Sequence, residues 1–363
     1  MASAVDSRIF KPFLPSLLHF ATVKVAVALC NDFHLVTLQH AFGNIKAGKV
    51  NVLFGNDELP LMLEIQRAQE KLRSIPGCLR KRVMEAVHGL IYVSRQWRDD
   101  QYRILRSECE DCNFYWRSDG RIDGNKTAQH FVQNANIDFR KRFALACKYC
   151  LQESIQTLWP EVEASGETDG LGMDLNYMVR FWVIRMRDGS RVPQTQDLRK
   201  FFSNLLHCLM APRLCSFFPS VRPEKRENYF FFIKLAEDDD CLSCLYAMTE
   251  EEQKLMAKRF PLKLLNIAME WPLRSIFVET VEKMWNYIDA RCFRDLMDLF
   301  FEKESAWKDF DYYELFEVFW NSSPIHLRES VKKIPYLRAK IDFCLNEIRK
   351  GEELIFKNEE MKK

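Results

Sequence analysis

The sequence has little glycine and proline and almost no net charge. Its 363 residues include 12 Gly and 13 Pro, and 53 Lys and Arg nearly balance 51 Asp and Glu. Because strand-rich folds need glycine and proline in their turns, this scarcity favours helix. The balanced charge lacks the basic excess of a dedicated nucleic-acid-binding protein, so we expect no nucleic-acid partner. Basic clusters at 80–82 and 140–142 fall in amphipathic segments with acids nearby, which is typical of solvent-exposed helix faces.

The chain also lacks a hydrophobic run long enough to cross a bilayer. Its most apolar stretch, 14–30, is short and is interrupted by His19 and Lys24. The first ten residues lack the basic and apolar regions of a signal peptide. We therefore expect a cytoplasmic protein with no membrane contact. In that reducing compartment the 12 cysteines would be free thiols that pack as small apolar side chains.

Apolar residues recur at helical spacing along most of the chain. The clearest stretch is 139–159, for which Asp138 is the expected N-cap and Pro160 the expected stop. The residues from Thr249 to Glu252 predict a capping box at the start of another helix. Further apolar stripes occupy 273–287, 293–301, 315–320 and 336–349. We predict an all-α fold, an irregular array of stacked helical hairpins that is α-solenoid-like but has no clean repeat.

One segment interrupts the helical pattern in the first half of the chain. Residues 109–126 contain two Asp-Gly pairs, which are turn signals. We take this segment as a linker loop. The predicted organisation is an N-terminal helical region over 1–108, the linker over 109–126, and a helical-hairpin array over 127–363.

Two motifs suggest chemistry but lack part of what that chemistry needs. The segment 43–49 matches the start of a nucleotide-binding P-loop, yet Val50 replaces the hydroxyl residue that binds magnesium. Three Cys-x-x-Cys pairs begin at Cys109, Cys147 and Cys241, but their spacers are longer than those of four-cysteine zinc sites. We predict no cofactor, no metal site and no catalytic residue. A carboxylate pair assembled from distant acids is the alternative that a single sequence leaves open.

A short N-terminal stretch carries a recognisable pattern. Segment 15–25, Pro-Ser-Leu-Leu-His-Phe-Ala-Thr-Val-Lys-Val, resembles the elongin-binding helix of a SOCS box. By this resemblance Leu17 would be the anchor in the pocket of elongin C, with Ala21 and Val25 on the same helix face. Ala21 stands where the family usually has cysteine. The resemblance implies an elongin–cullin ubiquitin ligase as the partner.

The second part of a SOCS box is a Leu-Pro-rich segment that selects the cullin. Two stretches match it in part, namely 59–61 and Ile75-Pro76 followed by Leu79. The resemblance to the SOCS box therefore covers about the first 80 residues at most.

Longer segments resemble large all-helical protein families that are expanded in arachnids. The resemblance implies a fold of stacked helices and no particular activity. The segments that carry it are 142–159, 269–285 and 310–324.

Together these patterns predict a non-enzymatic protein–protein interaction scaffold. The sequence has 28 Phe, 8 Trp and 11 Tyr, more than we expect a core to use, so the remainder would line a binding groove. The sharper alternative is a substrate adaptor of an elongin–cullin ubiquitin ligase, which would bind elongin through Leu17, Ala21 and Val25. An enzyme whose site is assembled from distant residues is the third hypothesis.

Overall fold

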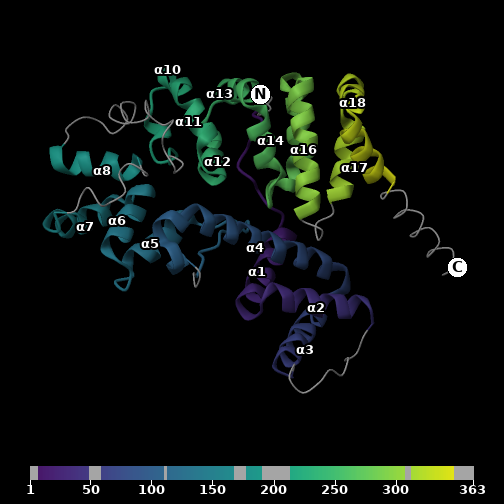
Figure 1. The fold of residues 1–363 in the computed structure, drawn as a ribbon, viewed down its shortest axis with the longest axis horizontal. Coiled ribbons are helices and arrows are strands. Elements are labelled where there is room, and N and C mark those ends of the chain that lie inside the picture. Colours follow the sequence, from purple (N-terminus) through teal and green to yellow (C-terminus); the bar gives the residue numbers. More distant parts are fainter. Residues whose placement is uncertain are drawn as a thin grey trace, which may run out of the picture. The chain divides into compact units, whose positions relative to one another are not determined.

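The computed structural model describes residues 7–48, 59–109, 113–166, 177–189, 213–306 and 312–346. Within these ranges the chain is all-α, as predicted, and its only β pairing is an isolated antiparallel bridge between Trp116 and Ile122. The chain forms two compact units, and Figure 1 labels most of their helices. Unit 1 comprises residues 1–12 and 218–363, and unit 2 comprises residues 13–217.

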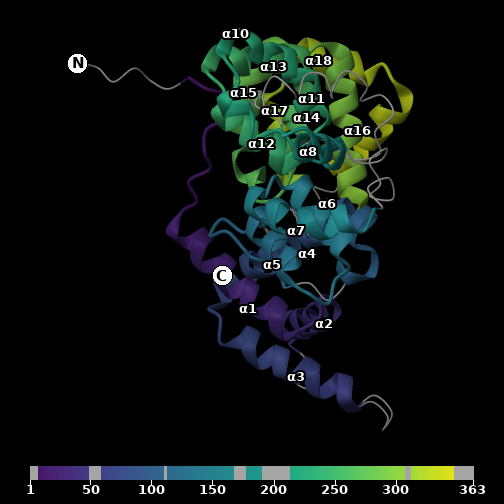
Figure 2. The same ribbon diagram turned by 90° about the vertical axis from the view of Figure 1, so that its left-hand side faces the viewer.

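Unit 2 contains the N-terminal helices. Helix α1 packs on α4, α2 packs on α3, and α6 packs on both α7 and α8 (Figure 2). The bounds of these helices are α1 (Leu17–Asp32), α2 (Leu35–Lys46), α3 (Leu59–Arg73), α4 (Gly77–Leu105), α5 (Gly124–Gln133), α6 (Phe139–Lys148), α7 (Gln152–Ala164) and α8 (Tyr177–Asp188).

The predicted linker lies inside unit 2, between α4 and α5. Helices α4 and α6 pack against each other on either side of it in sequence, so the two flanking regions share one core. The segment also ends earlier than expected, because α5 begins at Gly124 with Asp123 as its N-cap. Between α4 and α5 the chain makes a tight turn, in which Gly120 has a φ of 92° and the carboxylate of Asp119 pairs with the guanidinium of Arg121.

The prediction of a single helix over 139–159 is wrong, because the chain forms two helices there, α6 and α7. Asp138 is the N-cap of α6, as predicted, and its carboxylate accepts a hydrogen bond from the backbone N–H of Arg140. Helix α6 ends at Lys148, and Cys150 follows with a φ of 54° in the left-handed region. Pro160 does not stop the second helix. It lies inside α7 with an exposed side chain, and the buried face of α7 continues beyond it.

Unit 1 contains the C-terminal helices. The capping box predicted at its α13 is present, with Thr249 and Glu252 exchanging hydrogen bonds between side chain and backbone. A further helical segment covers 335–346. The other bounds are α10 (Pro223–Arg226), α11 (Phe230–Leu235), α12 (Asp238–Ala247), α13 (Glu250–Arg259), α14 (Pro261–Met269), α15 (Phe277–Met284), α16 (Ala290–Ala306), α17 (Tyr312–Ser322) and α18 (Ile325–Lys332).

Aromatic side chains form the centre of unit 1. Phe319 of α17 is fully buried, and its ring stacks on Phe300 of α16 with the centroids 4.8 Å apart. It also contacts the rings of Phe277, Trp285 and Phe293. Much of the aromatic surplus is therefore used in the core, where α14 and α16 lie side by side (Figure 1).

The N-terminal residues 7–12, which we call the N-terminal strap, belong to unit 1. Phe10 of the strap is buried, and its backbone N–H donates a hydrogen bond to Oε1 of Gln253 on α13. Residues 243 positions apart in sequence are thus joined at this point.

No described helix is by itself long and apolar enough to cross a bilayer. Helices α1 and α2 reach that threshold only when they are taken together, as a pair bent by 115°. The α-solenoid-like stacking expected for 127–363 stays a prediction.

Candidate functional site

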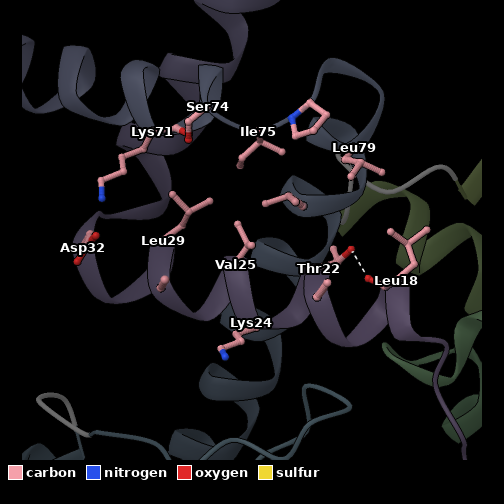
Figure 3. Close-up of a pocket in the computed structure, with 14 residues that line it drawn as sticks. Leu18, Thr22, Lys24, Val25, Leu29, Asp32, Lys71, Ser74, Ile75 and Leu79 are labelled. Carbon is pink, nitrogen blue, oxygen red and sulfur yellow. Dashed lines mark hydrogen bonds between the residues drawn. The ribbon is translucent and has the colours of Figure 1, made fainter.

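Unit 2 carries an open groove between α1 and the elbow that joins α3 to α4. Its volume is about 620 Å³. Figure 3 shows Val25 and Leu29 of α1 pointing toward Ile75 of the elbow. The residues that line the groove are Leu18, Ala21, Thr22, Lys24, Val25, Ala28, Leu29, Asp32, Lys71, Ser74, Ile75, Pro76, Leu79 and Val83.

Local sequence and one distant contact fix the position of α1. Ser16 is the N-cap, and its side chain accepts a hydrogen bond from the backbone N–H of His19. The His19 ring nitrogen Nε2 lies 2.9 Å from the backbone carbonyl oxygen of Asp119. Since Val23 and Ala26 are buried and α1 packs on α4, the opposite side of α1 is left accessible.

The residues predicted to bind elongin lie on this accessible side. Leu17 is 85% exposed, Val25 is 39% exposed, and Ala21 is exposed as well. Ala21 and Val25 line the groove, whereas Leu17 lies outside it. The face of α1 that carries all three is therefore open to a partner.

The elbow forms the other wall of the groove. It includes Ile75, Pro76 and Leu79, the residues that resemble part of a cullin-selecting segment. Arg80 holds this elbow together, because its guanidinium donates hydrogen bonds to three backbone carbonyl oxygens at the end of α3 and in the turn. These are the carbonyls of Leu72 at 2.9 Å, Ile75 at 2.9 Å and Arg73 at 3.1 Å.

Sequence reasoning missed the role of Arg80. It treated 80–82 as a solvent-exposed basic cluster, and Arg82 is indeed exposed. The signal that could have found Arg80 is its position, just after a Pro-Gly pair that ends one helix and begins the next. At such an elbow the last carbonyls of a helix need donors from elsewhere in the chain.

The chemistry of the groove is that of a binding surface for apolar groups. Its apolar lining residues are all aliphatic, so the aromatic lining expected from the sequence is not found there. No His or Cys lines it, and its charged residues are Lys24, Asp32 and Lys71. Figure 3 places Asp32 and Lys71 at one end, and it shows Lys24 at the middle of α1 pointing away from the elbow.

Exposed large apolar side chains gather in the same part of the sequence. Of the fifteen that the described residues contain, seven lie between positions 14 and 63. Single exposed apolar residues are ordinary on a protein surface, and two of the seven, Leu18 and Val25, line the groove. The seven are Leu14, Leu17, Leu18, Val25, Val36, Leu61 and Leu63.

The two motifs that suggested chemistry have structural explanations as far as they are described. Gly43 lies inside α2, so the backbone there is helical and does not form the start of a phosphate-binding loop. Lys49, Val50 and Cys112 lie outside the described residues. Burial raises the pKa of the Cys147 thiol well above 9.0 and that of Cys241 to about 12. Across the described ranges no three His, Cys, Asp or Glu side chains are close enough to hold a metal ion.

Comparison of the chain with protein-family models, with curated proteins and with solved structures found no match. Function is therefore inferred from the groove and from the exposed face of α1. Both features lie within unit 2 and are built by residues 14–83.

Proposed function

We propose that this protein is a non-enzymatic protein–protein interaction scaffold and that the groove of unit 2 binds an apolar segment of a partner protein. The observation that carries this proposal is the groove itself, where aliphatic side chains of α1 and of the elbow face solvent across an open cavity. Such a surface gains free energy when apolar groups cover it, because water leaves both sides of the contact.

The shape and charge of the groove favour a helical segment. Helix-in-groove recognition uses apolar anchors at spacings of three and four residues, and here an aliphatic wall faces another aliphatic wall. Lys71 and Asp32 stand at the same end of the groove, so a polar residue at the matching end of the bound segment would be favoured. The proposal includes a reducing, cytoplasmic location, in which the cysteines of the chain would stay as thiols.

The experiment compares partner capture by three forms of the full chain. Leu79→Asp places a charge in the elbow wall, while aspartate in the first turn of α4 suits the positive end of that helix dipole. The matched control is Leu63→Asp, because Leu63 is 54% exposed on α3 and lies outside the groove. Quantitative mass spectrometry after affinity capture from cell extract should find a protein set retained by the wild type and the control but lost from Leu79→Asp. Identical sets on all three forms would contradict the proposal.

A second candidate is favoured by one specific observation. Leu17, Ala21 and Val25 are all accessible on α1, as a substrate adaptor of an elongin–cullin ubiquitin ligase requires. In this alternative α1 is the ligand and enters a groove of elongin C, and another part of the chain would hold a substrate. The resemblance of 15–25 to the elongin-binding helix supports it.

The two candidate functions depend on different residues, because the scaffold needs Leu79 in the groove and the adaptor needs Leu17 on α1. Purified elongin B–C complex would be titrated into the full chain by calorimetry, with Leu17→Asp and Leu63→Asp beside the wild type. An adaptor requires binding by the wild type and by Leu63→Asp and its loss in Leu17→Asp, provided that circular dichroism shows intact helix in every form. If the wild type does not bind elongin B–C, the adaptor is excluded and the scaffold proposal remains.

A further inference from the structure

The N-terminal strap lies in a slot of unit 1 that recognises main-chain atoms. The side-chain amide of Gln253 is fully buried, and it binds both the backbone N–H and the backbone carbonyl of Phe10. Its Oε1 accepts a hydrogen bond from the Phe10 N–H at 2.9 Å, and its Nε2 donates to the Phe10 carbonyl oxygen at 2.9 Å. Nε2 also donates to the Leu245 carbonyl oxygen at 2.8 Å, which holds the amide in place.

The side chains of the strap add an apolar pair and a charge. Phe10 is 1% exposed and Ile9 is 6% exposed. The charge of Lys11 acts on the carboxylate of Glu279 on α15, whose pKa is lowered mainly by a hydrogen bond from Lys283 and further by Lys11. The slot therefore buries an aliphatic and an aromatic side chain in succession, and a cation follows them.

The same tripeptide occurs once more in the chain. Ile9-Phe10-Lys11 is repeated as Ile355-Phe356-Lys357, in the C-terminal segment that follows the described residues. Because Gln253 binds only backbone atoms, it would bind the second copy as it binds the first. Apolar burial and the cation would be matched residue for residue.

The C-terminal copy begins nine residues after the last described helical segment. The helical segment 335–346 contacts α16 through a hydrogen bond from Tyr336 to Asp298 and through Lys340, which lies over the ring of Phe301. Helix α16 packs on α14, and α14 packs on α13, which carries Gln253. A chain of nine residues, from 346 to 355, spans up to about 30 Å when it is extended.

We propose that this slot is a binding site for an Ile-Phe-Lys segment, occupied by the N-terminal strap and open to residues 355–357 when the strap leaves. The two ends of the chain then compete for one site in unit 1. Occupancy of the slot decides whether residues before α1 are held on unit 1 or released. This inference is independent of the groove in unit 2.

The test measures binding of a fluorescent peptide with the sequence of residues 350–363 to the full chain by fluorescence anisotropy. Three chains are compared, namely wild type, Phe10→Ser and Phe10→Ser with Phe356→Ser. The double variant weakens both competing segments, so we expect it to bind the peptide at least about tenfold more tightly than the wild type. The single variant should lie between them, because its own C-terminal segment still competes.

Two controls make the result specific to the slot. The first control is a peptide with serine in place of Phe356. Its affinity for each of the three chains should be at least about tenfold weaker than the affinity of the parent peptide for the double variant. An unlabelled peptide of residues 5–14 should displace the parent peptide. Equal affinity for the three chains, equal binding of the serine peptide, or no displacement would each overturn the proposal.

A milder variant keeps the test decisive if Phe10→Ser does not fold, as judged by circular dichroism and melting temperature. Phe10→Leu retains most of the apolar volume and should tighten peptide binding by about threefold when it is combined with Phe356→Ser. An unchanged affinity in that folded chain would equally overturn the proposal.

Discussion

The Nε2 atom of His19 lies 2.9 Å from the backbone carbonyl oxygen of Asp119, a residue 100 positions further along the chain. This contact joins the first turn of α1 to the tight turn between α4 and α5. Asp119 is itself held by Arg121, whose guanidinium pairs with its carboxylate at 2.6 Å. Because α1 is one wall of the groove, the contact fixes that wall at the end where Leu18 lies.

We predict that His19→Ala lowers the free energy of unfolding by about 1 kcal/mol, the usual net value of one such hydrogen bond. The edge-to-face contact between the rings of Phe13 and His19 is lost in the same variant. Chemical denaturation followed by circular dichroism measures the change. His19→Gln keeps an amide donor and should recover part of the loss. A stability equal to that of the wild type in the alanine variant would show that the contact does not hold α1.

Arg80 is predicted to stabilise the second wall of the groove. Arg80→Ala removes three hydrogen bonds to carbonyl oxygens of the α3–α4 elbow, so we expect a loss of about 1–2 kcal/mol. The side chain is partly exposed, and water will satisfy some of the freed carbonyls. Arg82→Ala is the matched control, because Arg82 is exposed two residues later on the same helix, and it should change stability by less than about 0.5 kcal/mol. Denaturation curves that coincide for both variants would contradict a bracing role for Arg80.

Local signals in the sequence predicted helix ends well where the capping group is a neighbour of the helix. Asp138 and Thr249 both cap as expected, because each side chain bonds to a backbone N–H two or three residues away. The all-α class follows from helical periodicity in the same way. These features depend on residues within one turn of each other, which a single sequence displays directly.

Features that depend on packing between distant segments could not be predicted in this way. The break at Cys150 is hidden, since α6 and α7 pack on each other and apolar positions therefore continue across it. Pro160 was expected to stop a helix, yet its exposed ring leaves the buried face of α7 intact. The groove joins Val25 to Ile75, and no local pattern relates these two positions.

The buried amide of Gln253 gives the largest predicted effect of a polar substitution. Gln253→Leu leaves the Phe10 N–H, the Phe10 carbonyl and the Leu245 carbonyl without the partner that they have now. Since unsatisfied buried groups are expensive, we expect a loss of about 2–4 kcal/mol. Gln156→Leu, at an exposed position of α7, should cost less than about 0.5 kcal/mol. The two variants are compared by urea denaturation, and equal midpoints would refute the role of Gln253.

Three cysteines with raised pKa values predict a pattern of thiol reactivity. Burial raises the pKa of Cys30, Cys241 and Cys292 from 9.0 to about 12. At about pH 8 these three thiols stay protonated in the folded protein, so iodoacetamide should modify exposed Cys78 much faster than any of them. Peptide mapping by mass spectrometry after timed alkylation measures the four rates. Comparable rates in folded protein would mean that the pKa values of these three thiols are not raised.

The same shifts predict how stability changes in alkali. The folded state keeps a proton on each of these thiols up to a pKa of about 12, whereas in the unfolded chain they ionise near 9. Their contribution is therefore complete below about pH 9 and is lost progressively as the pH rises toward 12. Urea denaturation at a series of alkaline pH values should show a falling midpoint in this window. A Cys292→Ser variant should show a weaker fall.

Phe319 is predicted to be the most sensitive single apolar position among the aromatic residues of unit 1. Its ring is fully buried and contacts four other aromatic rings, from Phe277, Trp285, Phe293 and Phe300. Phe319→Ala removes these contacts and leaves a cavity that the surrounding rings fill only in part, so we expect a loss of about 3–5 kcal/mol.

Phe343 supplies the matched control for this variant, since it is 57% exposed on the helical segment 335–346 of the same unit. Phe343→Ala should change the free energy of unfolding by less than about 0.5 kcal/mol. Thermal and chemical denaturation of both variants would be followed by tryptophan fluorescence, because Trp285 stacks directly on Phe319. A loss below about 1 kcal/mol in Phe319→Ala would mean that the stacked aromatic rings do not form the centre of unit 1 in solution.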